Sequence, residues 1–228
     1  MNNIYIYRDQ IPVINNSFYI VIDVLRAFST SSVALNNGFS KVFLLNDIDD
    51  KNLLLSEFPN AVLAGENKAE QISCFPFDNS PSTFFFNKFN SNILGLKTTN
   101  GVRVTSALSK SSNVYAVGAN NVLETGLMLH NFFLNDQYDF NIITSHKTAE
   151  EDLACALFLQ DIIYSGCIPD LLSLSKLTLD IHKSEAAKKF YLNDKHLFSD
   201  LLIASSIFNH KPTRVDFNSS ILPFLYSL

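Results

Sequence analysis

The sequence is poor in the residues that mark several common classes of protein. It has no tryptophan, only 7 glycines among 228 residues, and three cysteines, Cys74, Cys155 and Cys167, which show no Cys-x-x-Cys or Cys/His spacing. A disulfide framework and a zinc site are therefore not indicated, and a cytoplasmic location is expected. Neither a Gly-x-x-x-x-Gly-Lys loop nor a Gly-x-Gly-x-x-Gly turn occurs, which argues against the common nucleotide-binding enzymes.

Basic residues and long apolar runs are also scarce. The 17 Lys and Arg are outnumbered by 22 Asp and Glu, giving a formal net charge of -5, whereas nucleic-acid binding needs clustered Lys and Arg. The most apolar stretch, around Ile20, is interrupted by Asp23 and Arg26. The first sixteen residues lack a cationic flank followed by an apolar core. We therefore expect no nucleic-acid partner, no membrane span and no signal peptide.

What the chain does have is enough apolar material for a large core. Hydrophobic residues make up 47% of it, and the length fits one domain over residues 1–228 or two closely joined halves, about 1–110 and 111–228. Short β-branched and aromatic runs alternate with segments of 3.6-residue periodicity, the pattern of an α/β fold. The strands are nearly continuously apolar, which predicts cover on both faces. Strands are predicted at residues 18–22, 41–45, 61–64, 93–97, 114–117 and 140–144, and helices at 28–37, 47–58, 102–108, 122–132 and 150–164.

The remaining segments give less definite expectations. After Gly166 the pattern is mainly helical, with helices predicted at 184–192 and 196–208 and a closing strand or extended segment around 221–225. The aromatic run at residues 83–86 is either a buried connection or an oligomer contact, burial being the preferred interpretation. A homo-oligomer is accordingly an open expectation.

Polar residues gather where the predicted strands end. They are Asp23, Gly65-Glu66, Thr98 to Gly101, Gly118 to Asn121, and Ser145 to Lys147. In open α/β sheets, ligands bind beyond the carboxyl ends of the strands, and backbone N–H groups at a strand-to-helix junction favour an anion. Each residue alone also fits an ordinary turn or helix cap. Together they predict a phosphate site.

These residues carry a resemblance to a known family. The motifs are Ile22-Asp23-Val24-Leu25-Arg26-Ala27, Ala64-Gly65-Glu66, Phe77-Asp78-Asn79-Ser80-Pro81, Thr98-Thr99-Asn100-Gly101 and Glu151-Asp152 with Cys155-Ala156. In order and rough spacing they resemble the 2-phosphosulfolactate phosphatase family across most of the chain. The resemblance implies a Mg²⁺-dependent hydrolase that removes phosphate from a small phosphorylated 2-hydroxy acid. With strands covered on both faces, we expect a layered α/β/α fold with a mixed, largely parallel central sheet.

Two positions depart from the family pattern. Asn67 stands where the family usually has an arginine, and Cys74, Phe75 and Pro76 occupy positions that commonly read Gly-Phe-Asp. The alternative is therefore a catalytically impaired member that binds a small anion or a partner without turnover.

The chemistry of phosphate release assigns roles to the motif residues. Asp23 is expected to be either a metal ligand or the nucleophile, with Glu66, Glu151 and Asp152 completing the metal shell. The catalytic set is Asp23, Arg26 and Asn100, because carboxylate, guanidinium and amide groups must converge on the ester. The phosphate and substrate ligands are expected to be Asn79, Ser80, Thr98, Thr99, Gly101 and Arg103.

Overall fold

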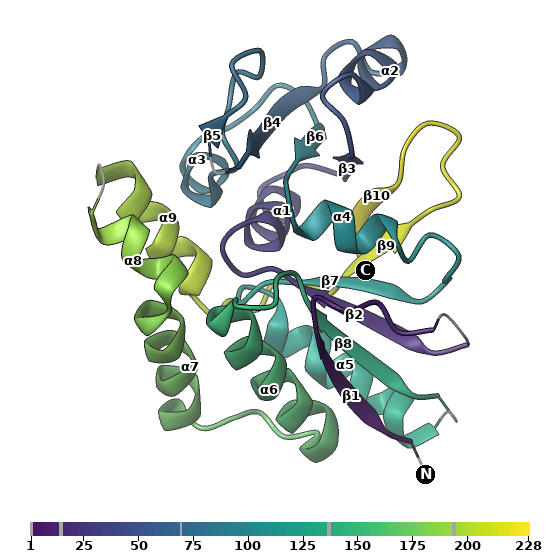
Figure 1. Ribbon diagram of the computed structural model, residues 1–228, viewed down its shortest axis with the longest axis vertical. Helices are drawn as coiled ribbons and strands as arrows, with labels where there is room; N and C mark the ends of the chain where they lie inside the picture. The colour runs from purple at the N-terminus through teal and green to yellow at the C-terminus, as the bar shows by residue number, and fades with distance from the viewer. Residues whose placement is uncertain (1, 14–15, 69, 136–137, 193–194) are drawn as a thin grey trace.

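A computed structural model describes residues 2–13, 16–68, 70–135, 138–192 and 195–228 (Figure 1). Its strands are β1 (Ile4–Arg8), β2 (Phe18–Ile22), β3 (Lys41–Leu45), β4 (Val62–Asn67), β5 (Glu70–Gln71), β6 (Ile93–Lys97), β7 (Val114–Val117), β8 (Phe140–Thr144), β9 (Thr213–Asp216) and β10 (Phe224–Ser227). Its helices are α1 (Ala27–Asn36), α2 (Asp50–Glu57), α3 (Pro81–Phe86), α4 (Gly101–Ser106), α5 (Val122–Asn135), α6 (Glu150–Ser165), α7 (Leu171–Lys183), α8 (Glu185–Leu192) and α9 (Lys195–Ser205).

The strands form one ten-stranded sheet in the order β1-β8-β2-β7-β9-β10-β3-β6-β4-β5. The strands β1, β8, β2 and β7 are mutually parallel, and so are β3, β6 and β4. Between these two sets the antiparallel pair β9 and β10 completes the sheet (Figure 1). This mixed, mostly parallel sheet flanked by helices confirms the predicted fold class.

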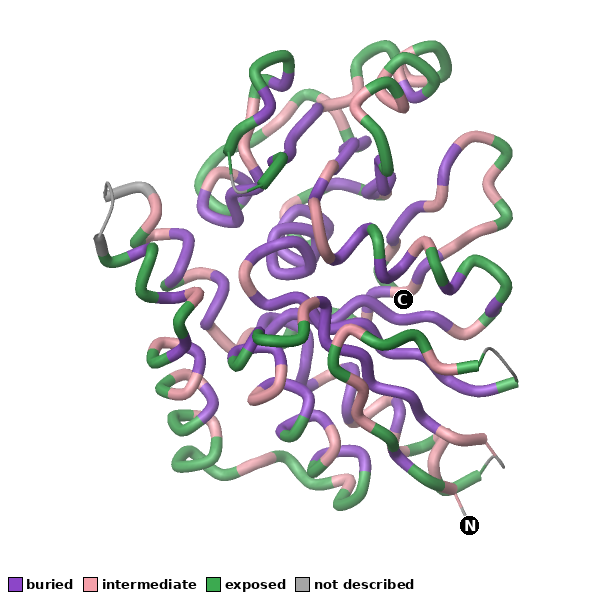
Figure 2. The backbone as a smooth tube through the Cα atoms, in the orientation of Figure 1, coloured by how far each residue is buried: buried purple, intermediate pink, exposed green. Residues whose placement is uncertain are grey.

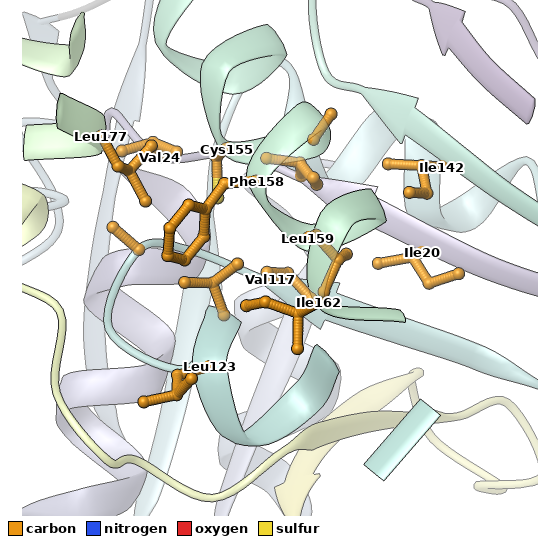
Figure 3. Packing of buried hydrophobic residues seen from close by; sticks show 14 of the residues in the cluster. Ile20, Val24, Val117, Leu123, Ile142, Cys155, Phe158, Leu159, Ile162 and Leu177 are labelled. Atoms are coloured by element: carbon orange, nitrogen blue, oxygen red, sulfur yellow. The ribbon is translucent and has the colours of Figure 1, made fainter. Parts of the chain in front are cut away.

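Alternation along β2 divides the core into layers, because successive strand side chains point to opposite faces. Phe18, Ile20 and Ile22 belong to the cluster that packs against α5 and α6, whereas Tyr19 and Val21 belong to the cluster built with α1 and α4. Figure 3 shows Ile20 in the first cluster, near the α6 side chains. Figure 2 shows that β2 and α1 are buried along their length, while the outer side of α7 is exposed.

Most predicted elements are confirmed, and the misses have physical reasons. The strands predicted at 18–22, 41–45, 93–97, 114–117 and 140–144 have those bounds, and the strand predicted at 61–64 extends through Asn67. The helix α3 was not predicted, because the run of phenylalanines in it has no helical periodicity. It begins at Pro81, and the Ser80 hydroxyl caps it by accepting a 3.2 Å hydrogen bond from the Thr83 N–H. Also unpredicted were β1, β5, β9 and α7, of which β1 and β9 gain their strand pairing only from distant segments.

The aromatic run and the C-terminal tail each resolve one open expectation. Phe84 is fully buried, but Phe85 is exposed and Phe86 is 70% exposed, so burial holds for one ring of the run. The tail forms β10, which pairs with both β3 and β9 and so closes the sheet between its two parallel sets. Within the described residues, no helix has the length and apolar character needed to cross a membrane. The division into one domain or two halves and the cytoplasmic location stay predictions.

Candidate active site

The carboxyl end of β2 places Asp23 at the centre of the candidate site. Its side chain is buried, and Oδ1 accepts a 3.0 Å hydrogen bond from the backbone N–H of Ala27, the first residue of α1. Gly101, which begins α4, lies against the other oxygen, because a Cβ at this position would stand 2.8 Å from Asp23 Oδ2. The junctions after β2 and β6 therefore meet at one carboxylate.

Asp152 ties the ends of two neighbouring strands together. This buried residue lies in the first turn of α6, and its Oδ1 accepts a 2.8 Å hydrogen bond from the Val24 N–H. Its Oδ2 accepts from the N–H and the hydroxyl of Ser145, at 3.2 and 2.9 Å. Since Val24 follows β2 and Ser145 follows β8, Asp152 fixes the geometry of the strand ends that flank Asp23.

Glu151 brings an unsatisfied oxygen to the same region. Its side chain is buried, and Oε2 has no hydrogen-bond partner among the described residues. Burial raises the pKa of this carboxylate, and a hydrogen bond from the Ser184 hydroxyl, at the end of α7, opposes part of that rise. A buried polar atom without a partner is costly, so Oε2 is a candidate ligand for a cation.

Glu66 joins the cluster from the other parallel set. It lies near the end of β4, and Oε1 and Oε2 accept hydrogen bonds from the N–H and hydroxyl of Thr99 at 2.6 and 3.0 Å. This pair connects the end of β4 to the junction that follows β6. The predicted grouping of Glu66 with the 98–101 segment is thus present in the structure.

Burial raises the pKa of three of the clustered acids, Asp23, Glu151 and Asp152. Burial is the largest cause that raises the pKa of Asp23 to about 6; the charges of Glu151 and Glu66 add to it, while the Ala27 N–H and the Ser145 hydroxyl oppose it. Burial, followed by the charges of Asp23 and Glu151, raises the pKa of Asp152 well above its ordinary value. Burial likewise raises the pKa of Glu151. Such a group of acids is stabilised by bound protons or by a cation.

Arg26, three residues after Asp23, brings a buried positive charge to the start of α1. Its Nη1 donates to Asp200 Oδ2 at 2.5 Å and its Nη2 donates to Asp78 Oδ2 at 3.1 Å. The guanidinium lies over the ring of Phe190, 5.5 Å from the ring centroid. Neither carboxylate was predicted to be a site residue. Asp78 stands inside one of the family motifs, whereas Asp200 lies in a helix that carries no motif.

The Asn79-Ser80 turn is attached to the same arginine network. The Ser80 hydroxyl donates to Asp200 Oδ1 at 2.7 Å and caps α3. Asn79 is buried, and its Oδ1 lacks a hydrogen-bond partner in the described part of the chain. Ser80 therefore shares Asp200 with Arg26, and the role of Asn79 and Ser80 in binding the substrate stays a prediction.

The remaining predicted ligands lie along the junction after β6. Thr98 is buried and its hydroxyl accepts a 3.4 Å hydrogen bond from the Val102 N–H, whereas Asn100 is half-buried and makes no side-chain cap. Arg103 is 52% exposed and forms an ion pair with Asp9, and its Nη2 also donates to the Ser145 carbonyl at 3.3 Å. Arg103 thus lies at the rim, outside the buried group formed by Asp23, Glu66, Glu151 and Asp152.

Comparison with known proteins shows that the sequence around the candidate site is similar to that of one protein family. A family model described as 2-phosphosulpholactate phosphatase matches residues 6–210. The chain belongs to this family. Three proteins, each named probable 2-phosphosulfolactate phosphatase, illustrate the likeness. The Bacillus subtilis protein is 31% identical over 172 residues, which cover 75% of this chain and 74% of that protein. The Caldicellulosiruptor saccharolyticus protein is 28% identical over 206 residues, covering 87% and 80%, and the Clostridium tetani protein is 27% identical over 187 residues, covering 80% and 78%.

Membership of the 2-phosphosulpholactate phosphatase family confirms two predictions made from the motifs. The family itself is confirmed, and so is the class of enzyme, a phosphoric monoester hydrolase. The matched range contains every predicted site residue, and it also contains Asp78 and Asp200. The role of each residue remains a separate question.

Proposed function

We propose that this family member hydrolyses the phosphate monoester of a small 2-hydroxy acid with the help of Mg²⁺. The observation that carries the proposal is the convergence of a buried acid cluster and a buried arginine at the ends of the strands. The printed names of the relatives, which specify 2-phosphosulfolactate, support the substrate class. Phosphate esters hydrolyse extremely slowly in water, and enzymes accelerate the reaction mainly by positioning and by neutralising charge.

The acid cluster fits a divalent cation by its donor chemistry. Among the described residues, no three His, Cys, Asp or Glu side chains stand in the arrangement of a ready-made metal cage. Mg²⁺ does not need one, because it is commonly held by one or two carboxylates together with water and substrate phosphate. The unpartnered Glu151 Oε2 and the buried Asp23 are the strongest ligands on this criterion. In the proposal, the one or two carboxylates that hold the cation come from the predicted set of Asp23, Glu66, Glu151 and Asp152.

The chain's own residues would bind and orient the ester. Arg26 would offer the guanidinium to a phosphoryl oxygen, while Thr98, Thr99 and Asn100 would offer hydroxyl and amide groups from the junction after β6. Gly101 keeps the space against Asp23 free of a side chain. Bound Mg²⁺ would neutralise charge on the phosphoryl group. Asp23 would act either as a ligand that fixes this arrangement, with water as the attacking group, or as the nucleophile. In the second case its carboxylate attacks phosphorus, the P–O bond to the alcohol breaks and the alcohol oxygen takes a proton from water; water then hydrolyses the aspartyl-phosphate and releases inorganic phosphate.

The proposal is tested by phosphate release from a panel of phosphorylated 2-hydroxy acids, including 2-phosphosulfolactate and 2-phospholactate. We expect release in the presence of Mg²⁺, none with EDTA, and none for Asp23→Asn. The matched control is Asp161→Asn, which neutralises an exposed carboxylate of α6 and is expected to retain activity. Undiminished release by Asp23→Asn would remove Asp23 from the chemistry, and full release in EDTA would refute the metal requirement.

The alternative, an impaired member that binds a small anion without turnover, rests on Asn67 and Pro76. Asn67 is exposed at the end of β4, and its backbone pairs with Glu70 of β5. Binding of inorganic phosphate without turnover of any ester would favour this alternative. The homo-oligomer stays a prediction to be checked by sedimentation.

A further inference from the structure

The two carboxylates that hold Arg26 differ in environment, and we propose that they have opposite roles. Asp200 is a positioning residue that anchors one end of the guanidinium. Asp78 is a gate that occupies the other end until an anionic phosphoryl group displaces it. The inference rests on the proposed function in one respect, that Arg26 binds the phosphoryl group.

Asp200 has the contacts of a permanent anchor. It is only 2% exposed, and its Oδ2 accepts from Arg26 Nη1 at 2.5 Å. Its Oδ1 accepts from the Ser80 hydroxyl at 2.7 Å, from the Ser82 N–H at 3.0 Å and from the Ser82 hydroxyl at 2.6 Å. Removing a buried carboxylate from such donors leaves several polar groups unsatisfied, which is strongly unfavourable. Asp200 therefore keeps its place whatever occupies the site.

Asp78 has fewer contacts and better access to water. It is 25% exposed, and among the residues that the structure describes its one ion pair joins Oδ2 to Arg26 Nη2 at 3.1 Å. Its Oδ1 accepts a 2.6 Å hydrogen bond from the N–H of the next residue, Asn79. Water is able to solvate the partly exposed Asp78 carboxylate when the pair separates, whereas Arg26, at 8% exposed, has to receive another oxygen in its place. Asp78 is therefore able to leave Arg26 when an anionic oxygen replaces it.

Charge counting explains why one carboxylate has to leave. One guanidinium between two carboxylates carries a net charge of about -1, which repels a phosphoryl dianion. The guanidinium has five N–H donors in a fixed fork, so Nη2 is able to exchange Asp78 for a phosphoryl oxygen while Nη1 stays on Asp200. A phosphoryl group is the better partner for that end, because it carries more charge and offers more acceptor atoms.

The test compares Asp200→Asn, Asp78→Asn and the control Asp161→Asn in two measurements. The first is the dissociation constant of inorganic phosphate, measured by titration calorimetry with Mg²⁺ present. The second is KM and kcat for the panel ester that the unmodified protein turns over fastest. For Asp200→Asn we expect phosphate affinity and kcat/KM to fall by about tenfold to a hundredfold, the range for losing a hydrogen bond between charged groups.

For Asp78→Asn the expected change has the opposite sign. Phosphate should bind about threefold more tightly and KM should fall, because the competing carboxylate charge is gone. A purely structural role would weaken binding in both variants, so a loss of affinity in Asp78→Asn overturns the gate, and unchanged affinity in a folded Asp200→Asn overturns the anchor. If Asp200→Asn does not fold, Ser82→Ala replaces it, since it removes one donor to Asp200 and should weaken phosphate binding; unchanged affinity there also overturns the anchor.

The outcome separates this inference from the proposed function. If no ester is turned over, the proposed function fails, and the opposite shifts in phosphate affinity still decide the inference. If esters are turned over but both variants shift KM in the same direction, the inference alone fails.

Discussion

Replacing Asp23 with asparagine is expected to stabilise the metal-free protein while it abolishes phosphate release. Asp23 is fully buried, and desolvation is the largest cause that raises its pKa from the ordinary 3.8 to about 6. The folded chain therefore disfavours the ionised carboxylate by about 2 pKa units, or about 3 kcal/mol at 1.36 kcal/mol per unit. The asparagine side-chain oxygen is still able to accept the hydrogen bond from the Ala27 N–H, so the substitution removes the charge and keeps this hydrogen bond.

The pH dependence fixes the sign of this effect. Because the pKa of Asp23 is higher in the folded chain, the folded state binds the proton more tightly between pH 3.8 and about 6. The free energy of unfolding therefore falls as the pH rises through this window and stays lower above it. Asparagine has no such loss. Above pH 6 the free energy of unfolding of Asp23→Asn should be higher than that of the original chain by up to about 3 kcal/mol. This difference should vanish as the pH falls to the pKa that Asp23 has in the unfolded chain.

Urea unfolding in EDTA at a series of pH values measures this difference directly. EDTA is required because a bound cation would stabilise the ionised cluster and hide the effect. Asp161→Asn is again the matched control, and its free energy of unfolding should change by less than about 0.5 kcal/mol at every pH. A variant that is less stable than the original chain above pH 6 would refute the reasoning, because it would show that the Asp23 charge is favourable in the folded state.

Three further predictions follow from single contacts. Gly101→Ala should lower the free energy of unfolding by about 1–3 kcal/mol and reduce phosphate release, since its Cβ would stand 2.8 Å from Asp23 Oδ2 and 3.0 Å from the Ala27 Cβ. Urea unfolding and the release assay measure both effects, and unchanged values would show that α4 moves to make room for the methyl group. Phe84→Ala should lower the free energy of unfolding by about 3–5 kcal/mol, because this buried ring packs against Phe39, Phe77 and Phe89. Phe86→Ala, at an exposed position, should lower it by less than about 0.5 kcal/mol, and equal losses in the two variants would contradict this packing. Burial lowers the pKa of His210 from its ordinary value of 6.5 to about 4. Between these pH values the unfolded chain binds a proton that the folded chain does not, so the free energy of unfolding falls as the pH drops, and His210→Gln should make this fall smaller. An equally steep fall in His210→Gln and the original chain would show that this histidine does not cause it.

The sequence predicts the parts of the fold that depend on local pattern. Residues 18–22 form β2 as expected, because a continuously apolar run has to be buried on both faces. Gly38, which follows the end of α1, has a φ of 113°, and glycine adopts this conformation without strain. By contrast, β9 exists only because β7 and β10 flank it, and no local pattern at Thr213–Asp216 carries that information.

The candidate site divides in the same way. Asp23, Glu66, Asn100 and Asp152 were predicted to meet because each follows a strand or begins a helix beside one. Glu66 contacts Thr99, Gly101 lies against Asp23, and Asp152 contacts Ser145; the shared site of the four residues stays a prediction. Asp200 could not be found this way. It lies in the middle of α9, and only tertiary packing brings it to Arg26, 174 residues earlier in the chain.

The charges of the site also constrain the order in which its ligands bind. The candidate site contains four buried carboxylates, and its arginine is already paired twice, so its own side chains offer an incoming phosphate ester little positive charge. A bound Mg²⁺ would supply that charge, and the ester would in turn supply oxygen ligands to the cation. Each ligand should therefore tighten the binding of the other by the same factor, as thermodynamic linkage requires. A site of this composition is expected to hold either ligand weakly alone and both firmly together.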